Sequence, residues 1–87
     1  MSYEVVLTAN ASRQFRRLER IFQDRIREAI DSLADLPRPP GVKKLIGRHD
    51  YWRIRVGDYR TVYHIEDRQL IVTVIKIAHR RDVYRDE

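Results

Sequence analysis

The stretch YWRIRVGDYRTVYHI, residues 51–65, has the alternation and the central turn of a β-hairpin. Its two halves are rich in aromatic and β-branched residues, and Gly57-Asp58 between them suits a two-residue type II′ turn. Such a turn fixes the register and pairs Arg55 with Arg60 and Tyr51 with His64. Alternation then divides the hairpin into an apolar face with Trp52, Ile54, Val56, Tyr59 and Tyr63, and a polar face with Tyr51, Arg53, Arg55, Arg60 and His64.

The polar face of this hairpin places like charges opposite one another. Arg55 facing Arg60 opposes folding by up to about 1 kcal/mol unless an anion lies over the pair. A cluster that binds an anion is one interpretation. The alternative is that the two flexible guanidinium groups splay into solvent on an open face.

The segment before the hairpin predicts a strand followed by helices. Tyr3 to Leu7 is strand-like, and Thr8 after it is a suitable helix N-cap. From Ala9 to about Leu36 apolar residues recur at spacings of three and four, as in an amphipathic helix. One rod of that length would span ~40 Å, which is too long for so small a domain, so we expect a break near Glu19 to Gln23.

Proline and glycine end the helical region, and strands follow. Pro37 to Gly41 contains three prolines, and Lys43 and Lys44 after it are predicted to lie in a loop. Leu70 to Ile77 is almost continuously apolar, as in a central strand. The sequence therefore predicts an α+β fold of order β-α-α-β-β-β, with an N-terminal helical hairpin packed on a small, mainly antiparallel four-stranded sheet.

The composition limits the architecture and the class of site. A chain of 87 residues can enclose one modest core, so residues 1–87 are expected to form a single domain. Cysteine is absent, which excludes disulfides and thiolate zinc sites. No apolar run approaches the ~20 residues of a membrane span, and the N-terminus lacks the features of a signal peptide, so a cytoplasmic, unprocessed protein is expected.

The net charge of +5 is unevenly distributed. Residues 1–40 balance seven arginines against six acids, whereas residues 41–64 hold six cations against Asp50 and Asp58. Those cations are Lys43, Lys44, Arg48, Arg53, Arg55 and Arg60. Such clustering indicates a phosphate-bearing partner, although an acidic protein would produce the same pattern.

The C-terminal segment adds to this basic region. In a three-stranded meander the end of the last strand lies beside the turn of the first hairpin, so His79, Arg80 and Tyr84 are expected near Arg55 and Arg60. No metal-ligand spacing, glycine-rich phosphate loop or Ser-His-Asp arrangement is present, so we expect no metal and no cofactor. The histidines at 49, 64 and 79 are more typical of surface or structural positions.

A basic pocket of this kind suits RNA cleavage. RNA carries its own nucleophile in the 2′-hydroxyl, so the protein need only align it, stabilise the developing charge and transfer two protons. Arginine suits the second task but, with a pKa above ~12, is a poor base. His79 and Tyr84 are the candidates for proton transfer, with His64 behind them. Packing on the sheet edge or stacking on a base is an equal alternative for Tyr84.

The string KKLIGRHDYWRIRVGDYRTVYHI, followed by VIKIAHRRDVY, resembles the RelE toxins of bacterial type II toxin–antitoxin modules, within the RelE/ParE superfamily. The likeness covers essentially the whole chain. It implies a small antiparallel sheet with an N-terminal helical hairpin. It also implies a ribosome-dependent, metal-independent endonuclease that cuts mRNA in the ribosomal A site and is held inactive by an antitoxin, which we expect to be acidic.

The resemblance also implies roles for individual residues. The predicted catalytic set is Arg53, Arg55, Arg60, His79, Arg80 and Tyr84, with Arg60 stabilising the transition state. The predicted RNA-binding set is Lys43, Lys44, Arg48 and Arg81. One departure matters, because the family pattern has lysines where this chain has Arg53 and Arg55, and arginine serves poorly as a base.

Two alternatives to the nuclease remain within the superfamily. A ParE-like toxin acts on DNA gyrase by protein binding and lacks the nuclease residues. A relic toxin would only bind its antitoxin. The joint presence of basic residues and the terminal tyrosine favours the nuclease.

Overall fold

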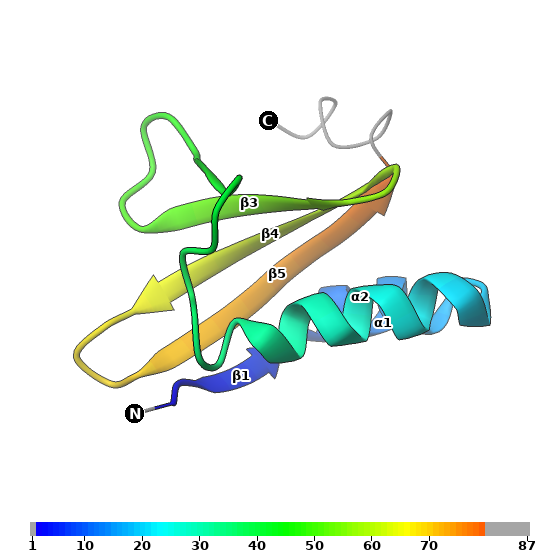
Figure 1. The fold of residues 1–87 in the computed structure, drawn as a ribbon, viewed down its shortest axis with the longest axis horizontal. Coiled ribbons are helices and arrows are strands. Elements are labelled where there is room, and N and C mark those ends of the chain that lie inside the picture. The colour runs from blue at the N-terminus through cyan, green and yellow to red at the C-terminus, as the bar shows by residue number, and fades with distance from the viewer. Residues whose placement is uncertain (1, 80–87) are drawn as a thin grey trace.

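The fold is α+β, as predicted, in a computed structural model that describes residues 2–79 (Figure 1). Its elements in chain order are β1 (Glu4–Leu7), α1 (Ala9–Arg16), α2 (Arg20–Ser32), β2 (Lys43–Lys44), β3 (Tyr51–Val56), β4 (Tyr59–Glu66) and β5 (Ile71–His79). The expected order of elements is confirmed, with one strand added.

The sheet has five strands in the order β1-β5-β4-β3-β2, where four were predicted. The extra strand is β2, because Lys43 and Lys44 pair antiparallel with Arg53 and Trp52 of β3 instead of lying in a loop. The chain after the prolines runs along the open edge of β3, where pairing satisfies backbone groups of both segments. β1 pairs parallel with β5, and the remaining pairs are antiparallel.

The helical region is a hairpin, as expected, but it breaks and ends earlier than predicted. α1 ends at Arg16 and α2 begins at Arg20, so the break precedes most of the segment from Glu19 to Gln23. The Gln23 side-chain amide explains this position, since it donates to the carbonyls of Phe15 and Arg16 at 3.1 and 3.4 Å and satisfies the end of α1. α2 ends at Ser32 rather than near Leu36.

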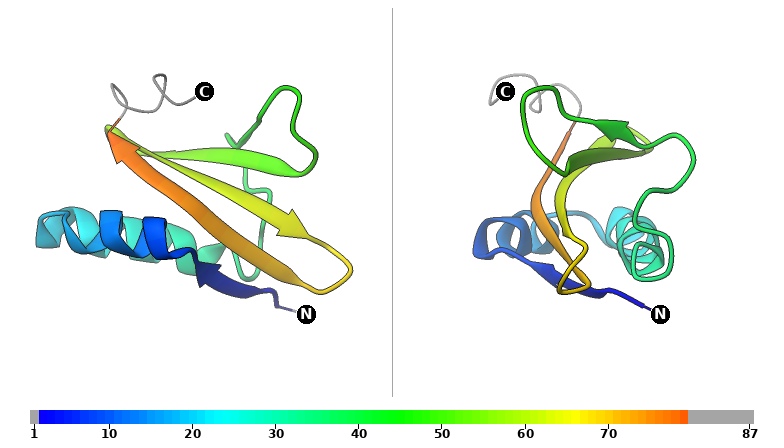
Figure 2. Two further views of the ribbon diagram at one scale, coloured as in Figure 1. Left: turned by 180° about the vertical axis from the view of Figure 1, so that it is seen from behind. Right: turned by 90° about the vertical axis from the view of Figure 1, so that its left-hand side faces the viewer.

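The core lies between the helices and one face of the sheet. Seen from the front and from behind, the helices and the loop after β2 lie on opposite sides of β3 (Figure 1 and the left view of Figure 2). Tyr63 is completely buried, and its hydroxyl donates to the Pro37 carbonyl at 2.7 Å. The buried apolar residues are Ala11, Ile26, Ile30, Leu33, Ile54, Tyr63, Ile65, Val72, Val74 and Ile77. The opposite face of the sheet, called the open face below, carries Arg53, Val62 and their neighbours in register.

The pairing of β4 with β5 is interrupted by a β-bulge. Val62 pairs with Lys76 and Tyr63 with Val74, which leaves Ile75 as an extra residue in β5. The bulge lets Val74 and Ile77 both reach the core and places Lys76 opposite Val62 on the open face. Unbroken alternation from Val74 would instead have placed Lys76 on the core side.

Thr8 supports both the bulge and the start of α1. Its hydroxyl accepts from the Ala11 amide at 3.1 Å, as predicted for an N-cap, and donates to the Ile75 carbonyl at 3.2 Å. The Thr8 amide donates to the Val74 carbonyl at 2.9 Å. One residue thus joins the end of β1, the beginning of α1 and the irregular part of β5.

Candidate nucleic-acid interface

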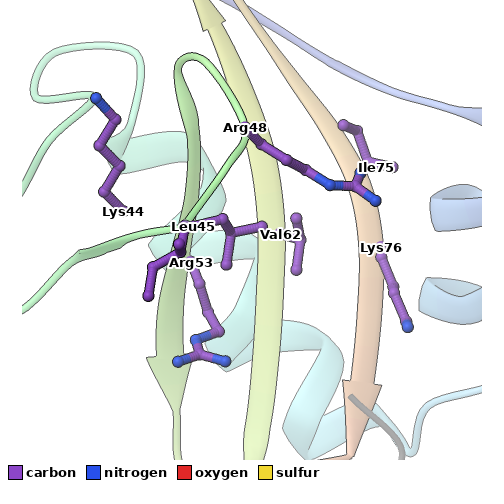
Figure 3. A pocket seen from close by; sticks show the side chains of 8 residues that line it. Lys44, Leu45, Arg48, Arg53, Val62, Ile75 and Lys76 are labelled. Carbon is purple, nitrogen blue, oxygen red and sulfur yellow. The ribbon is translucent and has the colours of Figure 1, made fainter. Parts of the chain in front are cut away.

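A hollow of about 330 Å³ lies on the open face, beneath the loop that joins β2 to β3. Leu45, Ile46, Val62 and Ile75 give it apolar walls, and Arg48, Arg53 and Lys76 supply its cations, with Lys44 completing the lining. Figure 3 shows Arg48 reaching from the loop across β4 toward β5, while Arg53 and Lys76 lie on either side of Val62. A concave surface with an apolar base and several cations suits the base and phosphate of a nucleotide.

The loop over the hollow is held at both of its ends. The Leu45 amide donates to the Tyr51 carbonyl at 2.9 Å, and the Arg48 guanidinium lies over the Tyr51 ring at 5.7 Å. The Tyr51 ring in turn contacts His64, its partner in β4, at 4.8 Å between centroids. The Asp50 carboxylate forms a salt bridge with the Arg38 guanidinium at 3.0 Å. These contacts position Arg48 beside the sheet instead of leaving it on a free loop.

Neither of the two predicted RNA-binding lysines points into this hollow, since Lys44 only borders it and Lys43 is not part of its lining. The Lys44 ammonium lies 5.9 Å from the centre of the Trp52 ring, and Figure 3 shows its side chain directed away from Arg48 and Arg53. Lys43 is exposed on the edge strand β2, opposite Arg53. Both lysines therefore lie at the rim of the basic surface.

Arg55 and Arg60 face each other across the hairpin, as the predicted register requires. Gly57 has φ +60° and Asp58 is not among the residues with positive φ, as in a type II′ turn. Arg55 is exposed, and its Nε donates to the Gly57 carbonyl at 2.8 Å, which directs the side chain along the turn. Arg60 is half-buried and pairs with Ala78 of β5. These arginines lie toward the turn end of the open face, while Arg53 lines the hollow.

His79 lies apart from these arginines. It pairs with Tyr59, and their rings meet at 5.5 Å, while Tyr59 also contacts Phe22 of α2 at 5.2 Å. Because neighbouring residues of a strand point to opposite faces, the sheet separates the His79 ring from the side chain of Arg60. The expected approach of His79 to Arg60 is not seen, and Arg80, Arg81 and Tyr84 lie outside the described residues.

Lys76 is the site residue that the sequence prediction missed. It lies in an almost wholly apolar strand and lines the hollow only because the bulge at Ile75 turns it to the open face. The available signal was a lysine at a position that regular alternation assigns to the core, immediately before the apolar Ile77. A charge at such a position indicates a shift in phase of the strand.

A separate polar cluster holds the turn between β4 and β5. Arg38 binds Asp67 and Asp50, each at 3.0 Å, and the Tyr3 hydroxyl donates to Asp67 at 2.7 Å. The hydrogen bond from Arg38 is the main cause that lowers the pKa of Asp67, while the bond to Asp67 raises the pKa of both Tyr3 and Arg38. Arg38 also lies over the Trp52 ring at 5.2 Å, so the cluster fixes the segment before β2 against the sheet.

Within residues 2–79, no three His, Asp or Glu side chains are grouped as a metal site would need. No helix in this part of the chain is both long and apolar enough to span a bilayer.

Comparison with known proteins identifies the family of this chain. The family model described as the ParE toxin of the type II toxin–antitoxin system, parDE, matches residues 5–84. A putative RelE-like toxin protein of Escherichia coli is 31% identical over 88 residues, covering 97% of this chain and 92% of the relative. Toxin RelG of Mycobacterium tuberculosis is 34% identical over 90 residues, covering 98% and 99% of the two chains.

Solved structures show the same fold. The archaeal RelE–RelB complex from Pyrococcus horikoshii superposes with a TM-score of 0.83 at 28% identity, covering 94% of this chain and 99% of its counterpart. The isolated E. coli RelE toxin gives a TM-score of 0.81 at 25% identity, covering 98% and 94%. The chain therefore belongs to the RelE/ParE superfamily and is a RelE-like toxin of the type II toxin–antitoxin class.

Proposed function

We propose that this toxin is an mRNA endonuclease that uses the 2′-hydroxyl of its substrate as the nucleophile and thereby inhibits translation. The observation that carries the proposal is the convergence of Arg48, Arg53 and Lys76 from a loop and two strands around one hollow on the face that the helices leave open. Arg55 and Arg60 extend the same basic face toward the hairpin turn. Such a surface can align an RNA strand through its phosphates.

The proposed chemistry divides the work between charge stabilisation and proton transfer. Arg60 is assigned to the developing charge on the phosphorane, with Arg53 and Arg55 holding the flanking backbone and Arg80 completing the set by resemblance. His79 and Tyr84 remain the proposed proton-transfer groups. His64 gains weight, since it lies opposite Tyr51 on the same face as Arg53, whereas the His79 ring lies on the helix side. The proposal needs no metal ion, because the substrate supplies the nucleophile and arginine supplies the charge.

The proposed partners are mRNA in the ribosomal A site and a cognate acidic antitoxin. Relatives of known structure include complexes named RelE–RelB from P. horikoshii and RelBE2 from M. tuberculosis. The net charge of the chain is +5, which would favour binding of an acidic partner that covers the open face. Toxicity of the expressed chain should disappear when the antitoxin is present in stoichiometric amount; undiminished toxicity would argue against this control.

The matching family model favours one alternative, inhibition of DNA gyrase by protein binding, because its description names ParE. The two functions are separated by expressing the toxin in translating cells, mapping transcript 5′ ends, and assaying gyrase supercoiling with the purified chain. The nuclease predicts new ends in phase with codons and normal supercoiling. Blocked supercoiling with intact transcripts would establish the gyrase inhibitor instead.

A further inference from the structure

Lys76 lies between two hollows of the surface. One is the hollow on the open face that Arg48 and Arg53 also line. The second, of about 310 Å³, lies where the end of α1 meets β5 and is lined by Gln14, Arg17, Tyr59 and their neighbours. Among the described residues, Lys76 is the one common to the linings of both. A cation at this junction can contact a polymer that passes from one hollow to the other.

The edge of β5 beyond the end of β1 is open enough for a polymer to cross it. β1 pairs with β5 only as far as Val74, and among residues 2–79 no other strand lies on that side of the second half of β5. There the Gln14 side-chain oxygen accepts the Ile77 amide at 2.7 Å and brings α1 against the strand. The edge is thus closed by a helix side chain, which leaves the second hollow beside it.

The positive charge continues from this hollow onto the helices. Arg17, at the C-terminal end of α1, is exposed and lines the second hollow. The corner between α1 and α2 carries Arg13, Arg16 and Arg20 beside it, against the single acid Glu19. A polyanion leaving the open face over Lys76 would therefore remain in a positive field.

We propose that Lys76 is an RNA phosphate contact, and that single-stranded RNA continues from the open face across the edge of β5 to Arg17. The inference rests on the proposed function, since it takes RNA as the substrate. It adds a second segment of binding surface and assigns to it two residues, Lys76 and Arg17, that the resemblance does not name. Their role is to hold the strand beyond the cleaved phosphate, so they are positioning residues.

The test measures the salt dependence of binding, using a single-stranded 2′-O-methyl oligonucleotide that lacks the nucleophile. Each phosphate contact to a single strand contributes about 0.7 to the slope of log K against log salt concentration. Lys76→Met, which keeps the apolar stem, and Arg17→Gln should each lower the slope by roughly that amount. Lys76→Arg should retain the wild-type slope. Arg68→Gln, in the distant β4–β5 turn, is the matched control and should also retain it.

The outcomes distinguish this inference from the proposed function. If Arg53→Gln lowers the slope while Lys76→Met and Arg17→Gln do not, the RNA surface ends at the first hollow and the inference is overturned. If the wild-type protein shows no salt-dependent binding, or if Arg53→Gln is also without effect, the RNA-binding function itself fails. Thermal unfolding of each variant verifies that a changed slope does not come from an unfolded fraction.

Discussion

The two hairpins that share β4 are specified in different ways. The β3–β4 hairpin turns on Gly57-Asp58 alone, and all six of its pairs follow from that turn. The β4–β5 hairpin has a longer turn in which Leu70 takes φ +57°, and it contains the bulge at Ile75. Its turn is held from outside by Arg38 and Tyr3 through Asp67, and its bulge by Thr8. Register is local in the first hairpin and depends on tertiary contacts in the second.

This difference extends to the proposed site. The β3–β4 hairpin, which is regular, supplies Arg53, Arg55 and Arg60, and their common face follows from alternation alone. The irregular β4–β5 hairpin supplies Lys76. Its orientation depends on the extra residue Ile75 and on the hydrogen bond that Ile75 accepts from Thr8, 67 positions before it in the chain. The proposed surface thus combines charges of local and of tertiary origin.

The largest expected effect concerns the regular hairpin. If the proposed mechanism holds, Arg60→Ala should reduce cleavage of translated transcripts by about 10²–10³, because in that mechanism Arg60 donates to the charge of the transition state. The fold should persist, since the turn and the other five pairs are unchanged. Rates are measured from transcript ends after induction, and thermal unfolding reports on the fold.

Arg68→Ala is the control for this experiment, since it removes the same charge from the turn of the other hairpin. It should cleave at close to the wild-type rate. Cleavage by Arg60→Ala at the rate of the wild type would remove Arg60 from the mechanism and leave the basic face as a binding surface only.

The next effect concerns the irregular hairpin. Thr8→Val keeps the shape of the side chain but loses both the N-cap of α1 and the hydrogen bond to Ile75, so the free energy of unfolding should fall by about 1–2 kcal/mol. The matched control is Thr73→Val, in the regular part of β5 opposite His64, which should change stability less. Urea denaturation measures both. Equal losses would mean that Thr8 has no special part in supporting the bulge.

The contrast between local and tertiary control of register also explains which features could be predicted from the sequence. Sequence reasoning predicted the fold class, the β3–β4 register and the Thr8 cap because each depends on neighbouring residues. It placed Lys43 and Lys44 in a loop because a two-residue strand carries no periodic signal.

The predicted site divides in the same way. The hairpin arginines lie on one face, but His79 was expected among them because the last strand was predicted to end at Ile77, whereas β5 continues to His79 and pairs it with Tyr59. Lys76 was missed because the bulge before it was not predicted from the local sequence pattern. Phase along β5 is set by contacts with Thr8 and α1, which no short stretch of sequence contains.

A smaller effect is expected at the turn of the regular hairpin. Gly57→Ala should destabilise the protein by about 1 kcal/mol, because φ +60° disfavours a side chain. Crowding is not the cause, since an added Cβ would meet only the end of Arg25, at 4.0 Å. D-Alanine at the same position, introduced by chemical synthesis, should therefore be tolerated. An equal loss with both alanines would indicate crowding instead of backbone conformation.

The smallest expected effect is the pH dependence contributed by the turn of the second hairpin. The pKa of Asp67 is lowered from 3.8 in the folded protein by the hydrogen bond from Arg38, so the unfolded chain takes up this proton first as pH falls. The contribution to stability is fully present above that ordinary value and is lost as pH falls through the folded pKa. Arg38→Met should flatten this part of the profile, measured as the urea midpoint between neutral and acidic pH, whereas Arg27→Met on α2 should retain the wild-type slope. If both variants keep the acid-dependent loss, Asp67 does not hold the turn through Arg38, and the second hairpin would depend on its bulge contacts alone.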